Sequence, residues 1–325
     1  MPSNPTPGQV HIDRALTNMM VAYEQEDSAF IAGKVFPQVN VQKQTDRYFV
    51  WDRSDMFRDK MEPVGPGGEA PIGIKRLSTD SYRCEVYKYA ELLDDQTLAN
   101  ADDPLDLERM TVRSIAHAGL LKKETTWVSK FLTTGVWGLD REGVASGASS
   151  DQFVQFDAAS STPIELLRKD MYDMAEENGV MPNTLVVGPH VYRILLDHAE
   201  FIARYENVAP AIMNQDLIAA VLGVQRVLVP MAIQNTAVEG AAESNSFIHA
   251  RSMLLCYAAP SAGIGTPSAG LTFNWTGLQA PGMQMKRIDR PLRDSVQYQG
   301  ELAYDQKVVA PSLGKFYYNV VATTA

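Results

Sequence analysis

The sequence is poor in cysteine. Its 325 residues include only Cys84 and Cys256, which lie far apart and form no CxxC or Cys/His spacing. Two cysteines cannot build a disulfide framework, and a structural zinc site requires Cys and His ligands at short, regular spacings. These absences exclude a small disulfide-stapled protein and a zinc module, and the two thiols favour a reducing compartment.

Basic charge is also scarce. Lys and Arg number 29 against 39 Asp and Glu, which gives a net charge of −10 and an isoelectric point of about 5.0. Proteins that bind nucleic acid usually carry a basic excess or a basic stripe, and this sequence has neither. An acidic chain repels DNA phosphates unless a local patch reverses the sign, so we expect no specific DNA binding.

Long apolar runs are absent. No stretch approaches the ~20 apolar residues that a membrane span requires. The first residues, Met1–Val10, are polar, contain three prolines and have no apolar centre, so we expect no signal peptide. The sequence therefore predicts a soluble cytoplasmic product with no membrane partner.

Short catalytic motifs are missing as well. The sequence has no GxSxG elbow, no HExxH helix and no Walker A loop. Gly65–Ala70 (GPGGEA) loosely fits the dinucleotide pattern GxGxxA, but Pro66 lies inside it and Pro71 follows, so no helix opens there. We interpret this segment as a loop tip, and we assign no catalytic residue, no cofactor and no metal ligand.

Other groups admit a functional interpretation, but a structural one is favoured for each. An acidic cluster could bind a cation, but it also fits a turn and a helix N-terminus: Asp94, Asp95, Asp102, Asp103 and Asp106. His190 and His198 are expected on one helix with Asp197 between them, at a spacing that does not suit a metal pair. Several aromatic residues could stack bases, but no basic groove accompanies them and we expect sheet packing: Tyr48, Phe49, Trp51, Tyr82, Tyr87 and Tyr89. The turn in TLVVGPHVY is expected to build the domain rather than to hold a ligand.

Hydrophobic residues make up 45% of the chain, which is enough for a globular core, and the length fits about two domains. Residues 1–42 are predicted to form an arm. Its early prolines keep the start extended, and a helix is expected near Ala15–Tyr23. The following segment, Phe30–Gln44, mixes short apolar runs with Gly33 and Pro37. We expect it to pack poorly on itself and to lie on a neighbouring surface.

Residues 43–93 predict a long β-hairpin. Asp46–Asp52 is rich in aromatic and β-branched residues, and Asp80–Leu92 alternates with a period of two, which is typical of half-buried strands. Between them, Met56–Arg76 holds three prolines and four glycines, too long a connection for a tight turn. From Lys43 to Arg76 the sequence interleaves seven basic and six acidic residues. Such balanced charge suits pairing with other chains better than binding one strongly charged ligand.

The longest helix is predicted over residues 103–134. Asp103 can cap it, Pro104 fits its first turn and Asp106 complements its dipole, while Gly135 and Gly138 end it. Its apolar face is expected to be formed by residues at a helical spacing: Ala118, Leu121, Thr125, Val128 and Leu132. Residues 139–161 are small and polar, and they predict a loop or crossover.

Residues 162–270 predict a compact α/β domain with a central sheet. Thr162, Pro163 and Glu165 form a capping box for a helix that runs to Gly179. Short apolar strands then alternate with helices over residues 182–189, 190–205, 215–223, 224–230 and 252–259. Residues 271–325 return to strand patterns, at 271–275, 283–289, 294–311 and 315–321.

This order of elements resembles the Hong Kong 97-type major capsid protein of tailed bacteriophages. Several phrases are similar to that family: TDRYFVWDRSDMFRD, LDREGV preceded by SKFLTTGVWG, PNTLVVGPHVY, DLIAAVLGVQRVLVP and VVAPSLGKFYYNVV. The resemblance covers nearly the whole chain. It implies an α+β fold with an N-arm (1–42), an E-loop hairpin with supporting strands (43–93), a P domain with a spine helix (94–161), an A domain (162–270) and return strands of the P domain (271–325).

The resemblance implies a structural subunit and not an enzyme. Copies would assemble as hexamers and pentamers into an icosahedral head that encloses double-stranded DNA without binding it specifically, and assembly would take place in the host cytoplasm. Six residues of the E-loop tip are predicted to contact the P domain of an adjacent subunit: Arg58, Asp59, Lys60, Glu62, Lys75 and Arg76. The short arm implies a separate scaffolding protein. The resemblance also implies a portal, and a decoration protein stays open. Lys60 and Lys75 lie in the loop, but no activated partner is evident, so we predict no crosslinking.

Two alternatives remain open at this stage. An encapsulin-like nanocompartment resembles the same fold and encloses cargo proteins in place of DNA. A soluble α/β enzyme could use the 162–270 domain, and it would not form uniform polyhedral shells.

Overall fold

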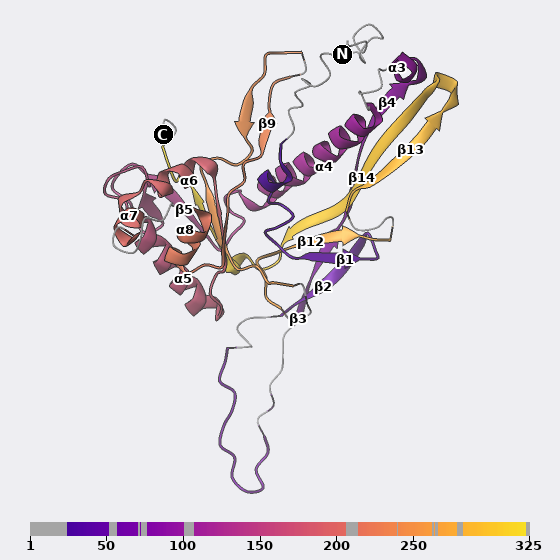
Figure 1. The fold of residues 1–325 in the computed structure, drawn as a ribbon. Coiled ribbons are helices and arrows are strands. Elements are labelled where there is room, and N and C mark those ends of the chain that lie inside the picture. The colour runs from indigo at the N-terminus through magenta and orange to yellow at the C-terminus, as the bar shows by residue number, and fades with distance from the viewer. Residues whose placement is uncertain are drawn as a thin grey trace.

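The computed structural model describes residues 25–51, 57–70, 72, 77–100, 107–205, 214–238, 240–261, 263, 266–277 and 282–322. Two sheets dominate this part of the chain. One lies beside a long helix, α4 (Leu107–Phe131), and the other carries a group of shorter helices (Figure 1). The α+β class predicted from the sequence is confirmed.

The first sheet has five strands: β1 (Gln38–Val41), β4 (Glu85–Asp94), β12 (Gly270–Trp275), β13 (Gln284–Arg290) and β14 (Ser295–Val308). β14 is the central strand. It pairs antiparallel with β13 and β12 in turn along one edge and with β4 along the other, and β1 adds to β12 in parallel. Val296 and Tyr298 of β14 turn one face of the sheet to Ile115 of α4.

The predicted long helix is present, but only the C-terminal part of its predicted apolar face packs on a core. Val128 and Leu132 pack against a buried cluster, whereas Ala118, Leu121 and Thr125 are partly exposed. The buried positions of α4 are instead Thr111, Ile115, Glu124, Thr126, Trp127 and Phe131. Two large aromatic rings bury more surface than Ala and Thr can, so they set the orientation of the helix. The helix ends at Phe131, one turn before Gly135, and its predicted capping residues 103–106 lie outside the described residues.

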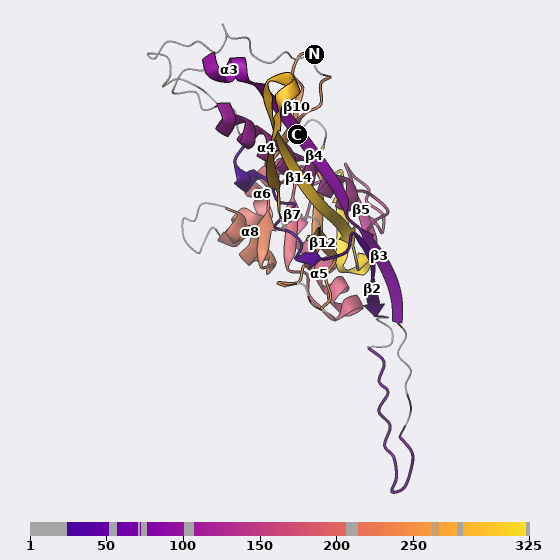
Figure 2. The same ribbon diagram turned by 90° about the vertical axis from the view of Figure 1, so that its right-hand side faces the viewer.

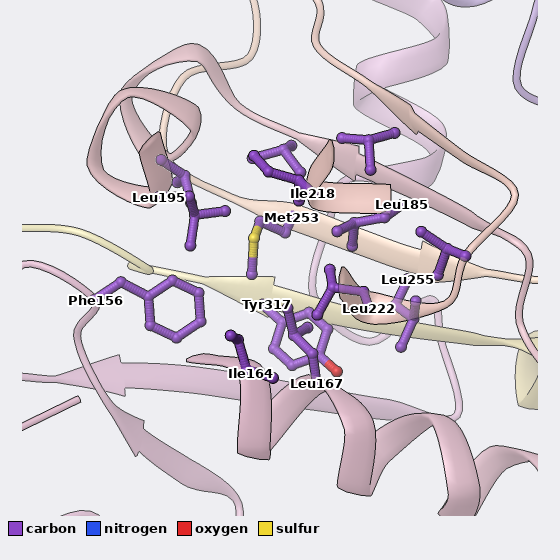
Figure 3. Packing of buried hydrophobic residues seen from close by; sticks show 14 of the residues in the cluster. Phe156, Ile164, Leu167, Leu185, Leu195, Ile218, Leu222, Met253, Leu255 and Tyr317 are labelled. Carbon is purple, nitrogen blue, oxygen red and sulfur yellow. The ribbon is translucent and has the colours of Figure 1, made fainter. Parts of the chain in front are cut away.

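The second sheet has six strands in the order β6 (Gln152–Val154), β5 (Leu139–Val144), β15 (Gly314–Tyr318), β11 (Met253–Cys256), β7 (Thr184–Val187) and β8 (Arg226–Leu228). Four helices pack on one face: α5 (Pro163–Asn178), α6 (Pro189–Leu196), α7 (Ala199–Tyr205) and α8 (Gln215–Leu222). Leu185, Leu255 and Tyr317 point from the sheet into this core (Figure 3). The other face, with Leu254 and Phe316, packs on the end of α4.

The prediction of a loop or crossover over residues 139–161 is wrong at 139–144 and 152–154, where β5 and β6 lie. The polar segment LDREGV forms the strand β5. The side chain of Arg141 is buried in it, because its guanidinium forms two bonds to the carboxylate of Asp170 of α5, at 2.6 and 2.8 Å. β5 pairs in parallel with β15, which follows it by about 170 residues in the sequence. The six-stranded sheet therefore combines strands from both sides of the expected 162–270 domain.

Two predictions at the ends of helices are also wrong. The capping box does not form, because Thr162 makes no side-chain bond to α5; Glu200 of α7 instead accepts the N–H of Ile164 at 2.9 Å. The helix expected over residues 190–205 is divided into α6 and α7, with His198 between them. His190 and His198 therefore do not share a helix.

The segment 25–37, called the strap below, was predicted to lie on a neighbouring surface. It packs on its own chain instead. Phe30, Ile31, Val35 and Phe36 are each at most 5% exposed. They pack between α4 and the six-stranded sheet. Their apolar side chains are removed from water there by residues of the same chain, so no partner chain is needed to bury them. Residues 1–24, including the helix expected at 15–23, lie outside the described residues.

Candidate assembly surface

A two-stranded hairpin projects from the body. β2 (Thr45–Trp51) pairs antiparallel with β3 (Leu77–Arg83), and residues 57–70 extend beyond its far end, away from both sheets (Figures 1 and 2). The sequence predicted one continuous strand over residues 80–92. The structure interrupts it at Cys84, so that β3 serves the hairpin and β4 serves the five-stranded sheet.

Aromatic packing anchors the base of the hairpin. Tyr82 and Cys84 are buried while Arg83 and Glu85 between and beside them are exposed, as the alternation in the sequence predicted. The ring of Tyr82 packs on Phe273 of β12. Burial raises the pKa of the Cys84 thiol to about 11, so this cysteine is an uncharged core residue.

Polar bonds add a second anchor at the same base. Lys307 of β14 pairs with Asp80 of β3 at 2.6 Å, and the hydroxyl of Tyr48 donates to the same carboxylate at 2.7 Å. Burial alone raises the pKa of Asp80, but the bonds from Lys307 and Tyr48 outweigh it and hold that pKa below its usual value. β2, β3 and β14 are thereby joined at one point.

Asp305, two residues from Lys307 on β14, bonds to both α4 and the hairpin strand β3. Its carboxylate pairs with Lys130 of α4 at 2.6 Å and accepts the N–H of Arg83 at 3.1 Å. The sequence analysis missed both Asp305 and Lys307, because their partners lie more than 170 residues away and no local pattern signals them.

The far end of the hairpin is exposed throughout its described part. Arg58, Asp59, Lys60 and Glu62 all lie on residues 57–70, every one of which is exposed. The other two predicted tip residues, Lys75 and Arg76, lie outside the described residues. The structure brings the first four together on one projecting loop.

The same loop carries apolar side chains that the sequence analysis did not single out. Met61 is 92% exposed and Ile72 is 95% exposed, and Val64 is also open to solvent. Phe57 lies against Gly179 at the end of α5. Gly65–Gly68 forms a turn closed by a backbone bond of 3.0 Å, as expected for a loop tip rather than a dinucleotide site. Exposed apolar groups beside mixed charge are typical of a surface that another protein covers.

The acidic and aromatic groups take structural positions where the structure describes them. Asp94 caps helix α3 (Asp95–Asn100) by accepting from the N–H and hydroxyl of Thr97. Across the described part of the chain, no cluster of His, Cys, Asp or Glu could hold a metal ion. Asp102, Asp103 and Asp106 lie outside it. Tyr87 packs on Tyr304 within the five-stranded sheet, while Phe49 is 67% exposed.

Two serine–histidine contacts bear on the enzyme alternative. Ser161 Oγ lies 2.9 Å from His198 Nε2, but His198 Nδ1 accepts the N–H of Glu200 at 3.2 Å. The proton of the neutral ring therefore sits on Nε2 and points at Ser161. Nε2 consequently has no free lone pair to receive the proton of the serine hydroxyl. His249 contacts Ser252 at 3.1 Å beside an open pocket of about 370 Å³, and burial lowers its pKa to about 4. Such a histidine is a weak base at neutral pH.

Among the described residues, no helix has both the length and the apolar character needed to cross a membrane.

Known proteins match this chain in their structure but not in their sequence. No protein-family model matches the chain, and no curated protein matches it. Solved structures do match over nearly its whole length, at identities that show the fold alone.

A phage-related protein from Bordetella bronchiseptica RB50 has a TM-score of 0.68 at 17% identity, covering 97% of this chain and 99% of its own. The capsid of the cyanophage P-SCSP1u has a TM-score of 0.62 at 10% identity, covering 92% and 91%. The holo-SrpI encapsulin complex of Synechococcus elongatus PCC 7942 has a TM-score of 0.52 at 13% identity, covering 96% and 97%. The chain therefore has the fold of phage capsid proteins, which an encapsulin shares.

Proposed function

We propose that this chain is the major capsid protein of a tailed bacteriophage, with the Hong Kong 97-like fold, and that copies of it build the icosahedral head around double-stranded DNA. The observation that carries the proposal is the hairpin. Its base is fixed to the body by Phe273, Asp305 and Lys307, while residues 57–70 expose apolar and charged groups beyond every other described element. A loop built in this way finds its contacts on another molecule.

In this proposal the hairpin and its loop serve as the E-loop, α4 as the spine helix of the P domain, and the α5–α8 region as part of the A domain. Residues 1–42 serve as the N-arm. The charged tip, from Arg58 to Glu62, contacts the P domain of an adjacent subunit. Mixed charge there sets the register between subunits more than the affinity, and closed symmetry lets many moderate contacts add up.

The partners follow from the same proposal. Subunits form hexamers and pentamers, a separate scaffolding protein and a portal act during assembly in the host cytoplasm, and the product is part of the virion. The wall carries a net charge of −10 per chain, which favours a lining that does not grip the packed genome.

The encapsulin-like alternative uses the same fold with a protein cargo. Its match is weaker, with a TM-score of 0.52 against 0.62 for the cyanophage capsid. The genes beside this one distinguish the two: portal and terminase genes accompany a phage capsid, and an enzyme with a targeting tail accompanies a nanocompartment.

Gel filtration and electron microscopy of the purified product test the proposal. We expect uniform polyhedral shells, with or without a co-expressed scaffolding protein. A matched variant in which a Gly/Ser linker replaces residues 59–69 keeps the body intact and should give unassembled subunits of normal fold. A product that stays a small soluble species under all conditions contradicts the proposal and favours the enzyme alternative.

A further inference from the structure

The strap contains a tight turn, residues 31–35. The carbonyl of Ile31 closes it by accepting the N–H groups of Lys34 and Val35 at 2.7 and 3.2 Å. The backbone of the turn thus presents N–H groups at its start and carbonyl groups at its end. These two ends carry opposite partial charges.

Two halves of the molecule meet at this turn: α4 with the five-stranded sheet, and the six-stranded sheet with its helices. A carboxylate from the α4 half bonds to the start of the turn. Glu124 of α4 accepts the N–H groups of Ile31 at 3.0 Å and Ala32 at 2.8 Å, both through Oε2. Glu124 has no exposed surface, and α4 packs on the five-stranded sheet. A buried carboxylate is stable only with such compensation, so the turn and Glu124 depend on each other. The cations that face it are Lys34 of the strap and Lys123 of α4.

A guanidinium from the other half holds the end of the turn. Arg226 of β8 donates to the carbonyls of Lys34 at 2.8 Å and Val35 at 2.7 Å. Its Nε donates to Thr184 of β7 at 2.9 Å, which fixes the side chain to the six-stranded sheet. The strap is also bonded at its start, because Gln25 exchanges two bonds of 2.8 Å with the backbone of Ile233, which follows β8 in the chain and lies outside the six-stranded sheet.

Apolar packing fills the space between the two charged contacts. Val35 is fully buried, and the ring of Phe36 lies 4.8 Å from that of Phe131 on α4. The strap lies between α4 and β9 (Ile233–Asn235) in Figure 1. The turn therefore contacts both halves at a point where they meet.

We propose that the turn 31–35, with Glu124 on one side and Arg226 on the other, is a two-sided latch that fixes the angle between the α4 half and the six-stranded half. When it is closed, Oε2 of Glu124 and the guanidinium of Arg226 both bond to the same short turn. When either side is released, the turn loses its fixed position and the other contact weakens with it. If the chain is a shell subunit, as proposed above, this angle sets the curvature of the shell, and that second step rests on the proposed function.

Hydrogen–deuterium exchange on the unassembled full-length chain tests the latch itself. We expect Glu124→Gln to speed exchange at the Ile31 and Ala32 amides by ~10-fold or more, as loss of a charged hydrogen bond does. The decisive variant is Arg226→Gln. It removes bonds to the carbonyls of Lys34 and Val35 and to Thr184, but none to the Ile31 or Ala32 amides, and it should still speed exchange at those two amides. The double variant should be no faster than the faster single variant.

Arg226→Lys keeps the charge but loses the two-pronged geometry, so it serves if Arg226→Gln does not fold. Glu165→Gln and Arg193→Gln remove exposed charges of the same kinds and should leave both amides unchanged. If the Arg226 variants leave Ile31 and Ala32 at the wild-type rate, or if the two single effects simply add, the two contacts are independent and the latch is wrong.

Electron microscopy of assembled particles tests the second step. We expect Glu124→Gln and Arg226→Gln to give particles of mixed size and shape where the wild type gives one. Particles of a single size from every variant contradict control of curvature. A wild-type chain that forms no particles at all contradicts the proposed function, and it leaves the exchange result on the latch standing.

Discussion

The ring of Tyr82 stacks on the ring of Phe273, with centroids 4.6 Å apart and planes inclined by 13°. Tyr82 belongs to the projecting hairpin and Phe273 to the five-stranded sheet, and both rings are almost fully buried. Since Tyr48 packs on the same ring at 5.7 Å, Phe273 contacts both strands of the hairpin. Phe273 thus provides the apolar anchor for both strands of the hairpin.

Replacing Phe273 by Ala should therefore destabilise the unassembled chain. Removal of a buried phenylalanine lowers the free energy of unfolding by about 3–5 kcal/mol, because apolar contacts are lost and a cavity remains. Urea denaturation measures it. Phe49→Ala is the matched control, since this ring is 67% exposed and its loss should change stability by less than about 0.5 kcal/mol. Equal effects for the two variants would contradict the anchoring role of Phe273.

Asp170 is the centre of a buried charged cluster in the six-stranded half. It accepts from Arg141, from Lys315 at 3.2 Å and from the hydroxyl of Tyr317 at 2.7 Å. Asp170→Asn should lower the free energy of unfolding by about 3–5 kcal/mol, because it leaves two buried cations without their carboxylate. The control is Asp173→Asn, whose partly exposed side chain lies 3.8 Å from Lys315 and should cost at most about 1 kcal/mol. Thermal or urea unfolding of the two variants separates the outcomes.

Glu301 predicts how stability depends on pH. A hydrogen bond from Lys286 and the charge of Lys88 hold the pKa of this carboxyl below its usual value of 4.5, although burial opposes the shift. An acid whose pKa is lower in the folded state contributes stability above its unfolded pKa and loses it as the pH falls through the folded pKa. The stability difference between wild type and Glu301→Gln should therefore be full at pH 7 and shrink below about pH 4.5. Urea midpoints from pH 7 to pH 3 check this, with exposed Glu165→Gln as control; a constant difference would contradict it.

Charge reversal at the loop tip tests the predicted contact with an adjacent subunit. Arg58→Glu combined with Lys60→Glu should sharply reduce the yield of closed particles, because like charges then meet where opposite charges paired. Circular dichroism and the urea midpoint should stay at wild-type values, since both residues are exposed. Reversal of Lys169 and Arg193, also exposed, controls for the change in net charge. Normal particle yield from the tip variant would remove these residues from the interface.

Isolated subunits should bind DNA too weakly to detect at physiological salt. The chain carries ten net negative charges, and phosphate contacts supply most non-specific affinity. Fluorescence anisotropy with a labelled duplex measures the binding, and repetition at low salt separates weak electrostatic attraction from none. Clear saturation at physiological salt would contradict a wall that does not grip the genome.

Local patterns in the sequence predicted the elements that have a short apolar run, a strand-like composition or a helical spacing. The strands β7, β11, β12, β13, β14 and β15 and the helices α5 and α8 lie where these patterns placed them. The long helix was also predicted, but not its buried face. Apolar spacing selected Ala118 and Leu121, whereas the contacts that orient α4 are made by Trp127, Phe131 and the buried Glu124.

The remaining errors share one physical cause, which is pairing over long sequence separations. The sequence of β5 is polar, so it did not predict a buried strand. Arg141 can be buried there because Asp170, 29 residues away, neutralises it. Glu200 replaces the expected cap of α5 from a different helix. The strap is buried by residues of α4 and β8 that no window around residue 31 contains. The four described tip residues share one exposed loop as predicted, but the residues that anchor its base depend on Asp305 and Lys307, far along the chain.

The central strand β14 has a mechanical consequence. Its first part is bonded to β4 on one side and to β13 on the other, and its last residues hold β12 and the base of the hairpin. A force applied to the loop is therefore transmitted along a single continuous strand to the opposite end of the five-stranded sheet. Sliding β14 by one residue would break its three ladders together, with β4, β13 and β12, and turn every side chain to the wrong face. Tension on one contact would thus move this half of the molecule as a stiff beam instead of stretching it.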